Sequence, residues 1–156
     1  MPVEYFAMSE AERETRTWLS RDLCRILPPA DAPDVARSYY IRATLEIPIH
    51  SASDPFCWGV WVSQSEKSFD RYLETYDQDQ SGDGSFGWLA VTMRPYQRSP
   101  VEPLEYLECN VEWGPPGKRP QVLLKPCDHP LFVDQRDGIS WDRAIEIAQI
   151  ALHGRT

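Results

Sequence analysis

An alternation of apolar and polar residues between Arg37 and Ile47 is the feature that most restricts how this chain can fold. One set of alternate positions carries only apolar or aromatic side chains: Tyr39, Ile41, Ala43, Leu45 and Ile47. The positions between them are polar or charged apart from Tyr40. Because a period of two residues is typical of a β-strand with one buried face, we expect a strand over residues 37–47 that ends at Pro48.

Four further segments have the character of strands. Residues 56–62 are bulky on both faces, which predicts a strand near the centre of a sheet. Residues 86–93 are strand-like, and residues 104–113 alternate between apolar and polar side chains. After a turn at residues 114–117, we expect residues 121–125 to return as the antiparallel partner of the preceding strand.

Two helix starts are indicated by capping boxes, in which a hydroxyl and a carboxylate three residues later each accept a backbone N–H. Ser9 with Glu12 predicts a helix that runs to about Ser20, and Ser63 with Glu66 predicts a second helix. A third helix is expected after an N-cap at Ser140. Its apolar stripe consists of Trp141, Ile145, Ala148 and Leu152, and it is widened by Ile147, Ile150 and Ala151.

These elements together predict an α+β fold. We expect an antiparallel sheet of about five strands, with N-terminal, middle and C-terminal helices packed on one face of it. The chain has 156 residues, of which 42% are hydrophobic and 12% aromatic, enough for one modest core. Neither a repeat nor a change of composition divides it, so we expect a single domain over residues 1–156.

The charge balance excludes several classes of partner. Lys and Arg number 16 and Asp and Glu number 24, which gives a net charge of −8. Because nucleic-acid binding depends on clustered Lys and Arg, we expect no nucleic-acid partner and no binding to an anionic membrane surface. A basic protein partner is compatible with this charge. No segment reaches the roughly 18–20 uncharged apolar residues that a membrane span needs.

The N-terminal sequence and the cysteines point to a cytoplasmic protein. No basic stretch precedes an apolar one at the N-terminus, so we expect no signal peptide. The four cysteines are widely spaced, which favours reduced thiols over disulfides in a chain of this kind. They are Cys24, Cys57, Cys109 and Cys127.

Several short motifs resemble, in the same order, those of one bacterial family. The motifs are residues 20–24 (SRDLC), 45–49 (LEIPI), 58–63 (WGVWVS), 87–89 (GWL), 119–120 (RP), 128–131 (DHPL) and 135–139 (QRDGI). From about Tyr5 to His153, the chain resembles the bacterial family catalogued as domain of unknown function 2199. The resemblance implies a shared fold and carries no reaction. Many members open with a zinc-ribbon-like Cys-x-x-Cys segment that this chain lacks, and we expect no cofactor and no metal.

Residues 77–85 partly match the calcium-binding loop of an EF-hand. Oxygen-bearing side chains at loop positions 1, 3 and 5 and Gly82 at position 6 fit the pattern. Position 12, which should supply a bidentate Glu, is Trp88, so a solvated turn is the preferred interpretation. The alternative is a calcium site formed by Asp77, Asp79, Ser81 and Asp83.

A second candidate is an enzyme pocket around Asp128 and His129, with Glu46 and Gln135 as further polar groups. An Asp–His pair suits acid–base catalysis, yet no nucleophile motif accompanies it. Asp128-His129-Pro130 also fits a simple turn, in which Asp bonds its own backbone and Pro fixes the exit. Cys127 and His129 form one close pair of zinc-ligand types where a zinc site usually has two.

A third candidate is a protein-binding surface. Alternation places Glu108, Asn110 and Glu112 on the same side of one strand, which predicts an acidic face. Together with exposed aromatic residues, such a face is typical of protein-binding surfaces, although burial in the core is the alternative for each tryptophan. The candidate contact residues are Trp58, Trp61, Glu108, Glu112 and Trp113.

The sequence therefore favours a small, acidic, cytoplasmic protein-binding domain. Its size, its charge and the lack of a catalytic motif fit an immunity or antitoxin-type protein that neutralises a basic partner. An enzyme of unknown reaction, using Glu46, Asp128 and His129, is the alternative.

Overall fold

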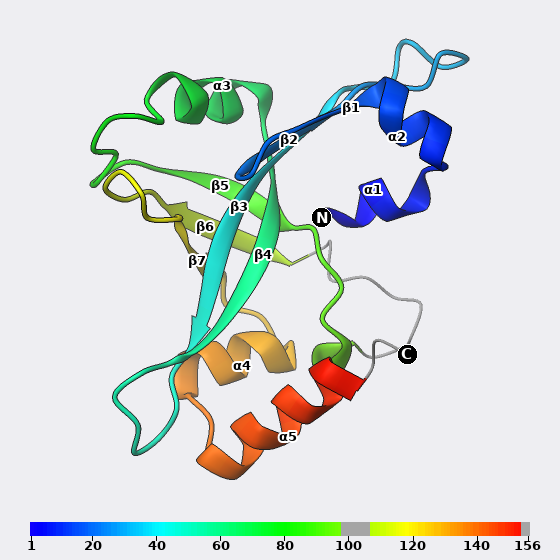
Figure 1. Cartoon of the computed structure of the whole chain (residues 1–156). Coiled ribbons are helices and arrows are strands. Elements are labelled where there is room, and N and C mark those ends of the chain that lie inside the picture. The colour runs from blue at the N-terminus through cyan, green and yellow to red at the C-terminus, as the bar shows by residue number, and fades with distance from the viewer. Residues whose placement is uncertain (98–106, 154–156) are drawn as a thin grey trace.

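The computed structural model describes residues 1–97 and 107–153, which form a mixed α+β fold around one twisted sheet (Figure 1). The strands are β1 (Thr17–Leu19), β2 (Leu23–Ile26), β3 (Ser38–Ile47), β4 (Phe56–Gln64), β5 (Gly84–Leu89), β6 (Glu108–Glu112) and β7 (Gln121–Leu124). The helices are α1 (Val3–Ala7), α2 (Glu10–Arg16), α3 (Glu66–Glu74), α4 (Pro130–Asp137) and α5 (Trp141–His153), with a 3-10 turn, η1, at Arg94–Tyr96.

Strands β3 to β7 close into a five-stranded barrel, and β1 and β2 extend the sheet beyond β3. Neighbouring strands pair antiparallel along the chain order, but β3 and β7 pair in parallel at Thr44 and Gln121. The expected antiparallel sheet of about five strands is therefore wrong in two respects: five of the strands close into a barrel, and one pairing in it is parallel. The reason is the length of β3, whose first residues pair with β2 while its later part meets β7 on the same edge.

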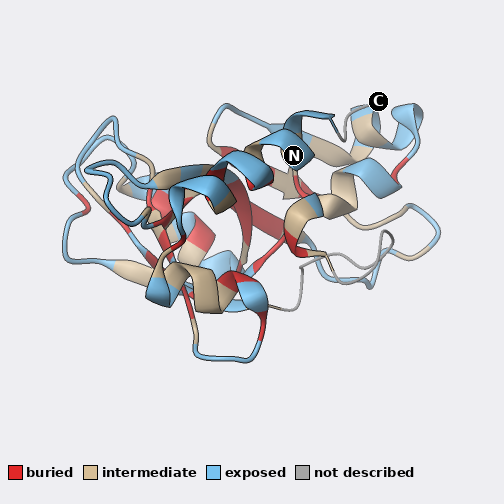
Figure 2. Cartoon of the chain, turned by 90° about the horizontal axis from the view of Figure 1, so that it is seen from below, coloured by how far each residue is buried: buried red, intermediate tan, exposed pale blue. Residues whose placement is uncertain are grey.

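The alternation that predicted β3 defines the interior of the barrel. All five apolar residues of the alternating set are at most 6% exposed, so this part of the prediction is confirmed. Their neighbours across the sheet include Val60 and Val62 of β4, which are also buried. Figure 2 shows buried residues gathered in the central strands, with exposed residues on the outer sides of helices and on loops.

The first two predicted helices exist with changed boundaries. The capping box at Ser9 and Glu12 is confirmed, but α2 ends at Arg16 because residues 17–19 pair with β2. The second helix begins after Ser65, whose side chain accepts the Ser68 N–H. The predicted start at Ser63 is wrong, because Ser63 still belongs to β4 and pairs with Trp88.

The C-terminal helix buries Ile147, which widens its expected apolar stripe, but it does not bury the centre of that stripe. Ala144 and Ile147 are its buried residues, whereas Trp141, Ile145 and Leu152 of the expected stripe are 60%, 44% and 67% exposed. Before it lies α4, a helix that the sequence did not predict. Residues 104–106 of the expected strand lie outside the described residues.

The helices lie around the barrel and do not share one face, which corrects the expected packing. Phe69 of α3 packs on Tyr39 near the start of β3, with 5.1 Å between ring centroids. By contrast, α4 reaches the end of β3, where Gln135 Nε2 donates to the Glu46 carbonyl oxygen at 3.5 Å. Helices α1 and α2 lie at the edge that carries β1 (Figure 1). None of the helices in the described part of the chain combines the length and hydropathy of a membrane span.

Candidate functional site

The outward side chains of β5, β6 and β7 form a continuous surface on the barrel, which we call the outer face. Cross-strand register places Trp88 opposite Glu108, and Phe86 opposite Asn110. On the next strand, Asn110 is in turn opposite Leu123. Residues directly opposite in a sheet have side chains on the same side. The outer face consists of Phe86, Trp88, Glu108, Asn110, Glu112 and Leu123.

The outer face leaves three large apolar side chains partly exposed. Phe86, Trp88 and Leu123 are 42%, 41% and 45% exposed. Phe86 and Trp88 meet edge to face, with 5.6 Å between ring centroids. Single exposed apolar residues are common, but a group held on one rigid sheet face is typical of an interaction surface.

Acidic side chains border this apolar group. Glu108 and Glu112 of β6 are exposed on either side of Asn110, as the sequence predicted for their shared face. At one edge, Lys125 Nζ lies over the Phe86 ring at 4.6 Å from its centroid. Neither glutamate takes part in the ion pairs formed within residues 1–97 and 107–153.

The predicted tryptophans lie elsewhere. Trp61 and Trp113 are only 5% and 4% exposed, and Trp58 is half-buried. Trp113 packs edge to face on Tyr72 at 5.1 Å and donates from Nε1 to Ser85 Oγ at 3.2 Å. Trp61 and Trp113 are thus core residues. They are not part of the outer face, on which Glu108 and Glu112 lie.

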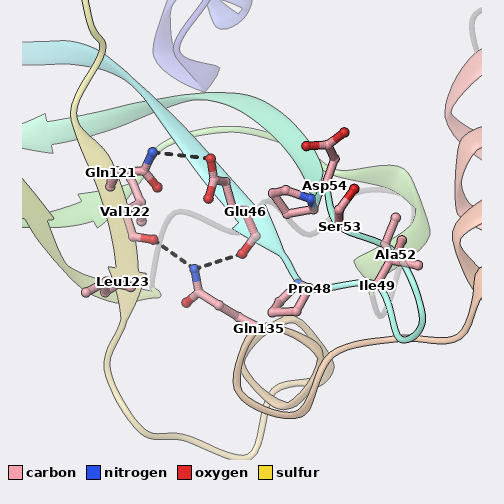
Figure 3. Close-up of a pocket in the computed structure, with 11 residues that line it drawn as sticks. Glu46, Pro48, Ile49, Ala52, Ser53, Asp54, Gln121, Val122, Leu123 and Gln135 are labelled. Carbon is pink, nitrogen blue, oxygen red and sulfur yellow. Dashed lines mark hydrogen bonds between the residues drawn. The ribbon is translucent and has the colours of Figure 1, made fainter.

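A pocket of about 380 Å³ lies beside the outer face, where β3 and β7 diverge (Figure 3). Its walls come from the end of β3, the loop at residues 52–55, residues 121–123 of β7 and Gln135 of α4. Glu46 points toward Gln121, whose Nε2 donates to its Oε1 at 3.3 Å. Leu123 belongs both to this pocket and to the outer face.

Gln135 closes the gap between the diverging strands. Its Oε1 accepts the Leu124 N–H at 2.8 Å, and its Nε2 donates to the Val122 carbonyl at 2.8 Å. The same Nε2 lies 3.5 Å from the Glu46 carbonyl (Figure 3). The side-chain amide therefore takes the place of a peptide group from a neighbouring strand, which is a structural role.

The structure brings together Glu46 and Gln135 but places Asp128 and His129 outside the residues that line this pocket. His129 is 8% exposed and is the N-cap of α4, because its Nδ1 accepts the Leu131 N–H at 3.1 Å. Asp128 is exposed in the segment before the helix. Partial burial and the nearby Glu46 carboxylate raise the pKa of the Cys57 thiol, which disfavours its thiolate form.

Two of the acidic side chains in the segment at residues 77–85 accept hydrogen bonds from the protein itself. Asp79 Oδ1 accepts the Ser81 N–H at 3.0 Å, and Asp83 Oδ1 accepts from Arg71 Nη2 at 3.2 Å. Asp77 is exposed. Within residues 1–97 and 107–153, no group of three or more His, Cys, Asp or Glu side chains has an arrangement that fits a metal ion.

The sequence interpretation missed Phe86, Trp88 and Leu123. For Phe86 and Trp88, the sequence contained a signal: two aromatic residues two positions apart, which a strand must place on the same face. The sequence alone does not say which face of β5 is buried. That choice follows from barrel closure, which turns Gly87 and Leu89 inward.

The chain is thus an α+β protein with a small closed barrel and an exposed face that carries aromatic and acidic side chains. A family model described as an uncharacterised protein conserved in bacteria, domain of unknown function 2199, matches residues 1–139. The chain belongs to this family, which confirms the resemblance of its motifs. No curated protein and no solved structure matches it.

Proposed function

We propose that the chain is a cytoplasmic protein-binding domain that recognises a basic partner through the outer face of β5, β6 and β7. The observation that carries this proposal is the exposed group of Phe86, Trp88 and Leu123 beside Glu108 and Glu112. Aromatic anchors at the centre and a polar, solvent-accessible rim are typical of protein-binding surfaces. Neutralisation of a basic partner, in the manner of an immunity or antitoxin protein, fits this surface.

The charge of the molecule supports the same choice of partner. With a net charge of −8, the chain attracts basic proteins over several ångströms and repels acidic ones. Such attraction accelerates association and weakens as salt rises. The apolar group then supplies the contact that is less sensitive to salt.

The test is capture of partners from the native cytosol with tagged protein at low and high salt, followed by mass spectrometry. The wild type is compared with a Phe86→Ser, Trp88→Ser double variant. We expect one stoichiometric basic partner, released as salt rises, with affinity at least about tenfold lower for the double variant.

The matched control removes an equally apolar surface at a different place. Trp141→Ser with Leu152→Ser changes two exposed residues of α5 and should leave capture unchanged. The proposal fails if the outer-face variant retains the partner, if the α5 variant loses it equally, or if folded wild type captures no stoichiometric partner at any salt concentration.

A further inference from the structure

The pocket between the ends of β3 and β7 combines apolar walls with acceptor groups at one side. Pro48, Ile49 and Pro55 supply part of the apolar lining. Glu46 and Asp54 supply carboxylates, with Glu46 half-buried and Asp54 exposed on the adjoining loop (Figure 3). A volume of about 380 Å³ is at the lower end of the range of small-molecule pockets.

The acceptors of this pocket are incompletely used. Gln121 donates one hydrogen bond to Glu46 Oε1, which leaves Oε2 for another donor. The ion pairs formed within residues 1–97 and 107–153 give neither Glu46 nor Asp54 a basic partner. A cation that enters the pocket therefore finds charge that the protein itself does not neutralise.

We infer that this pocket receives an arginine side chain of the basic partner. A guanidinium donates in a planar fork that matches a carboxylate, and its aliphatic stem packs on apolar walls. The inference rests on the proposed function, because Leu123 joins the pocket to the outer face and one partner segment can contact both. The pocket thereby adds selection for arginine to an otherwise general acidic and aromatic surface.

The experiment is an NMR titration of the ¹⁵N-labelled full chain with N-acetyl-arginine N-methylamide. The same compound with citrulline in place of arginine is the neutral isostere. We expect saturable shifts at millimolar ligand in the backbone amides of Glu46, Gln121 and Leu123, and no comparable shifts with the citrulline compound.

Glu46→Gln should weaken arginine binding at least about tenfold, since it removes the charge at the half-buried acceptor. Glu146→Gln removes the same charge from exposed α5 and should bind as the wild type does. Asp54→Asn, on an exposed loop, is a second pocket variant that should weaken binding even if Glu46→Gln perturbs the fold. Spectra of each unliganded variant show whether its fold is intact.

Four outcomes would each overturn the inference. They are equal binding of the citrulline compound, retained affinity in folded pocket variants, the absence of saturable shifts, and shifts spread over all acidic residues. Failure of the pocket and failure of the proposed function give different results. If the arginine compound does not bind but partner capture still depends on Phe86 and Trp88, only the pocket inference is wrong. If it binds while the outer-face variant keeps every partner, the pocket still selects arginine, but the proposed recognition through the outer face is wrong.

Discussion

Gly87 occupies a point where β4 and β5 approach too closely for a side chain. A Cβ at this position would lie 2.4 Å from Val62 Cγ1 and 2.6 Å from the backbone oxygen of Ser63. Because the second contact is with backbone, relief requires movement of β4 itself. We expect Gly87→Ala to lower the free energy of unfolding by about 1–3 kcal/mol, measured by urea denaturation.

Gly59 of β4 is the matched control, because a Cβ there would meet nothing within 4 Å. Gly59→Ala should change the free energy of unfolding by less than about 1 kcal/mol. Equal stability of the two variants would contradict the close packing of β4 on β5. A difference would show that this motif residue is a packing requirement, independent of any binding role.

At the level of elements, Gln135 of α4 acts as the link between the two strands that close the barrel. Gln135→Leu keeps the approximate size of the side chain but leaves the Leu124 N–H and the Val122 carbonyl without their partner. Each buried backbone group left unpaired costs about 1–3 kcal/mol. We therefore expect a loss of at least about 2 kcal/mol in the free energy of unfolding, measured by urea denaturation.

Hydrogen exchange at the Leu124 amide provides a local readout, and exchange there should accelerate in Gln135→Leu more than at other β7 amides. Gln121→Leu is the control, since the Gln121 side chain donates to the partly exposed carboxylate of Glu46. It should change stability by less than about 0.5 kcal/mol. Slow Leu124 exchange in folded Gln135→Leu would show that the amide does not hold this link.

The elements that the sequence predicted well are those with a strong periodic signal. Strand β3 alternates from Ile41 to Ile47, and β6 and β7 are separated by a turn rich in Gly and Pro. Helix α4 was missed because Leu131 is its only buried residue within the described structure, so no apolar stripe marks it. Helix α5 has apolar residues on two faces, and tertiary packing rather than periodicity selects Ala144 and Ile147 for the core.

For the candidate site too, the sequence predicted only what depends on periodicity within one element. The shared face of Glu108 and Glu112 was predictable from alternation within one strand. Its association with Phe86 and Leu123 was not, because it depends on the pairing of three strands and on the direction in which the barrel closes. The sequence also grouped His129 with Glu46, whereas the fold uses His129 to cap a helix.

For the molecule as a whole, Asp22 joins three parts of the chain that are distant in sequence. Its carboxylate accepts hydrogen bonds from the Tyr76 hydroxyl, after α3, and from Arg119 Nε at 3.2 Å, before β7. Two motifs of the family resemblance, residues 20–24 and 119–120, therefore meet in one contact. This contact holds the β1–β2 turn to the segment that leads into barrel closure.

The ionisation of Asp22 makes this link sensitive to acid. Burial favours the neutral acid, but hydrogen bonds from Tyr76 and Arg119 and the charge of Arg119 outweigh it and lower the pKa of Asp22 below its ordinary value of 3.8. A carboxylate whose pKa is lowered by folding stabilises the folded state above the unfolded pKa. That contribution is lost as pH falls through the folded pKa.

We expect Asp22→Asn to lower the free energy of unfolding at neutral pH by about 1–3 kcal/mol, measured by urea denaturation across a pH series. The difference from the wild type should stay constant above about pH 5 and shrink below about pH 4. Asp70→Asn removes the same charge from the exposed side of α3 and should change stability little at any pH. A difference for Asp22→Asn that stays constant into the acid range would contradict the link, because the loss would then come from packing instead of from the ionised carboxylate.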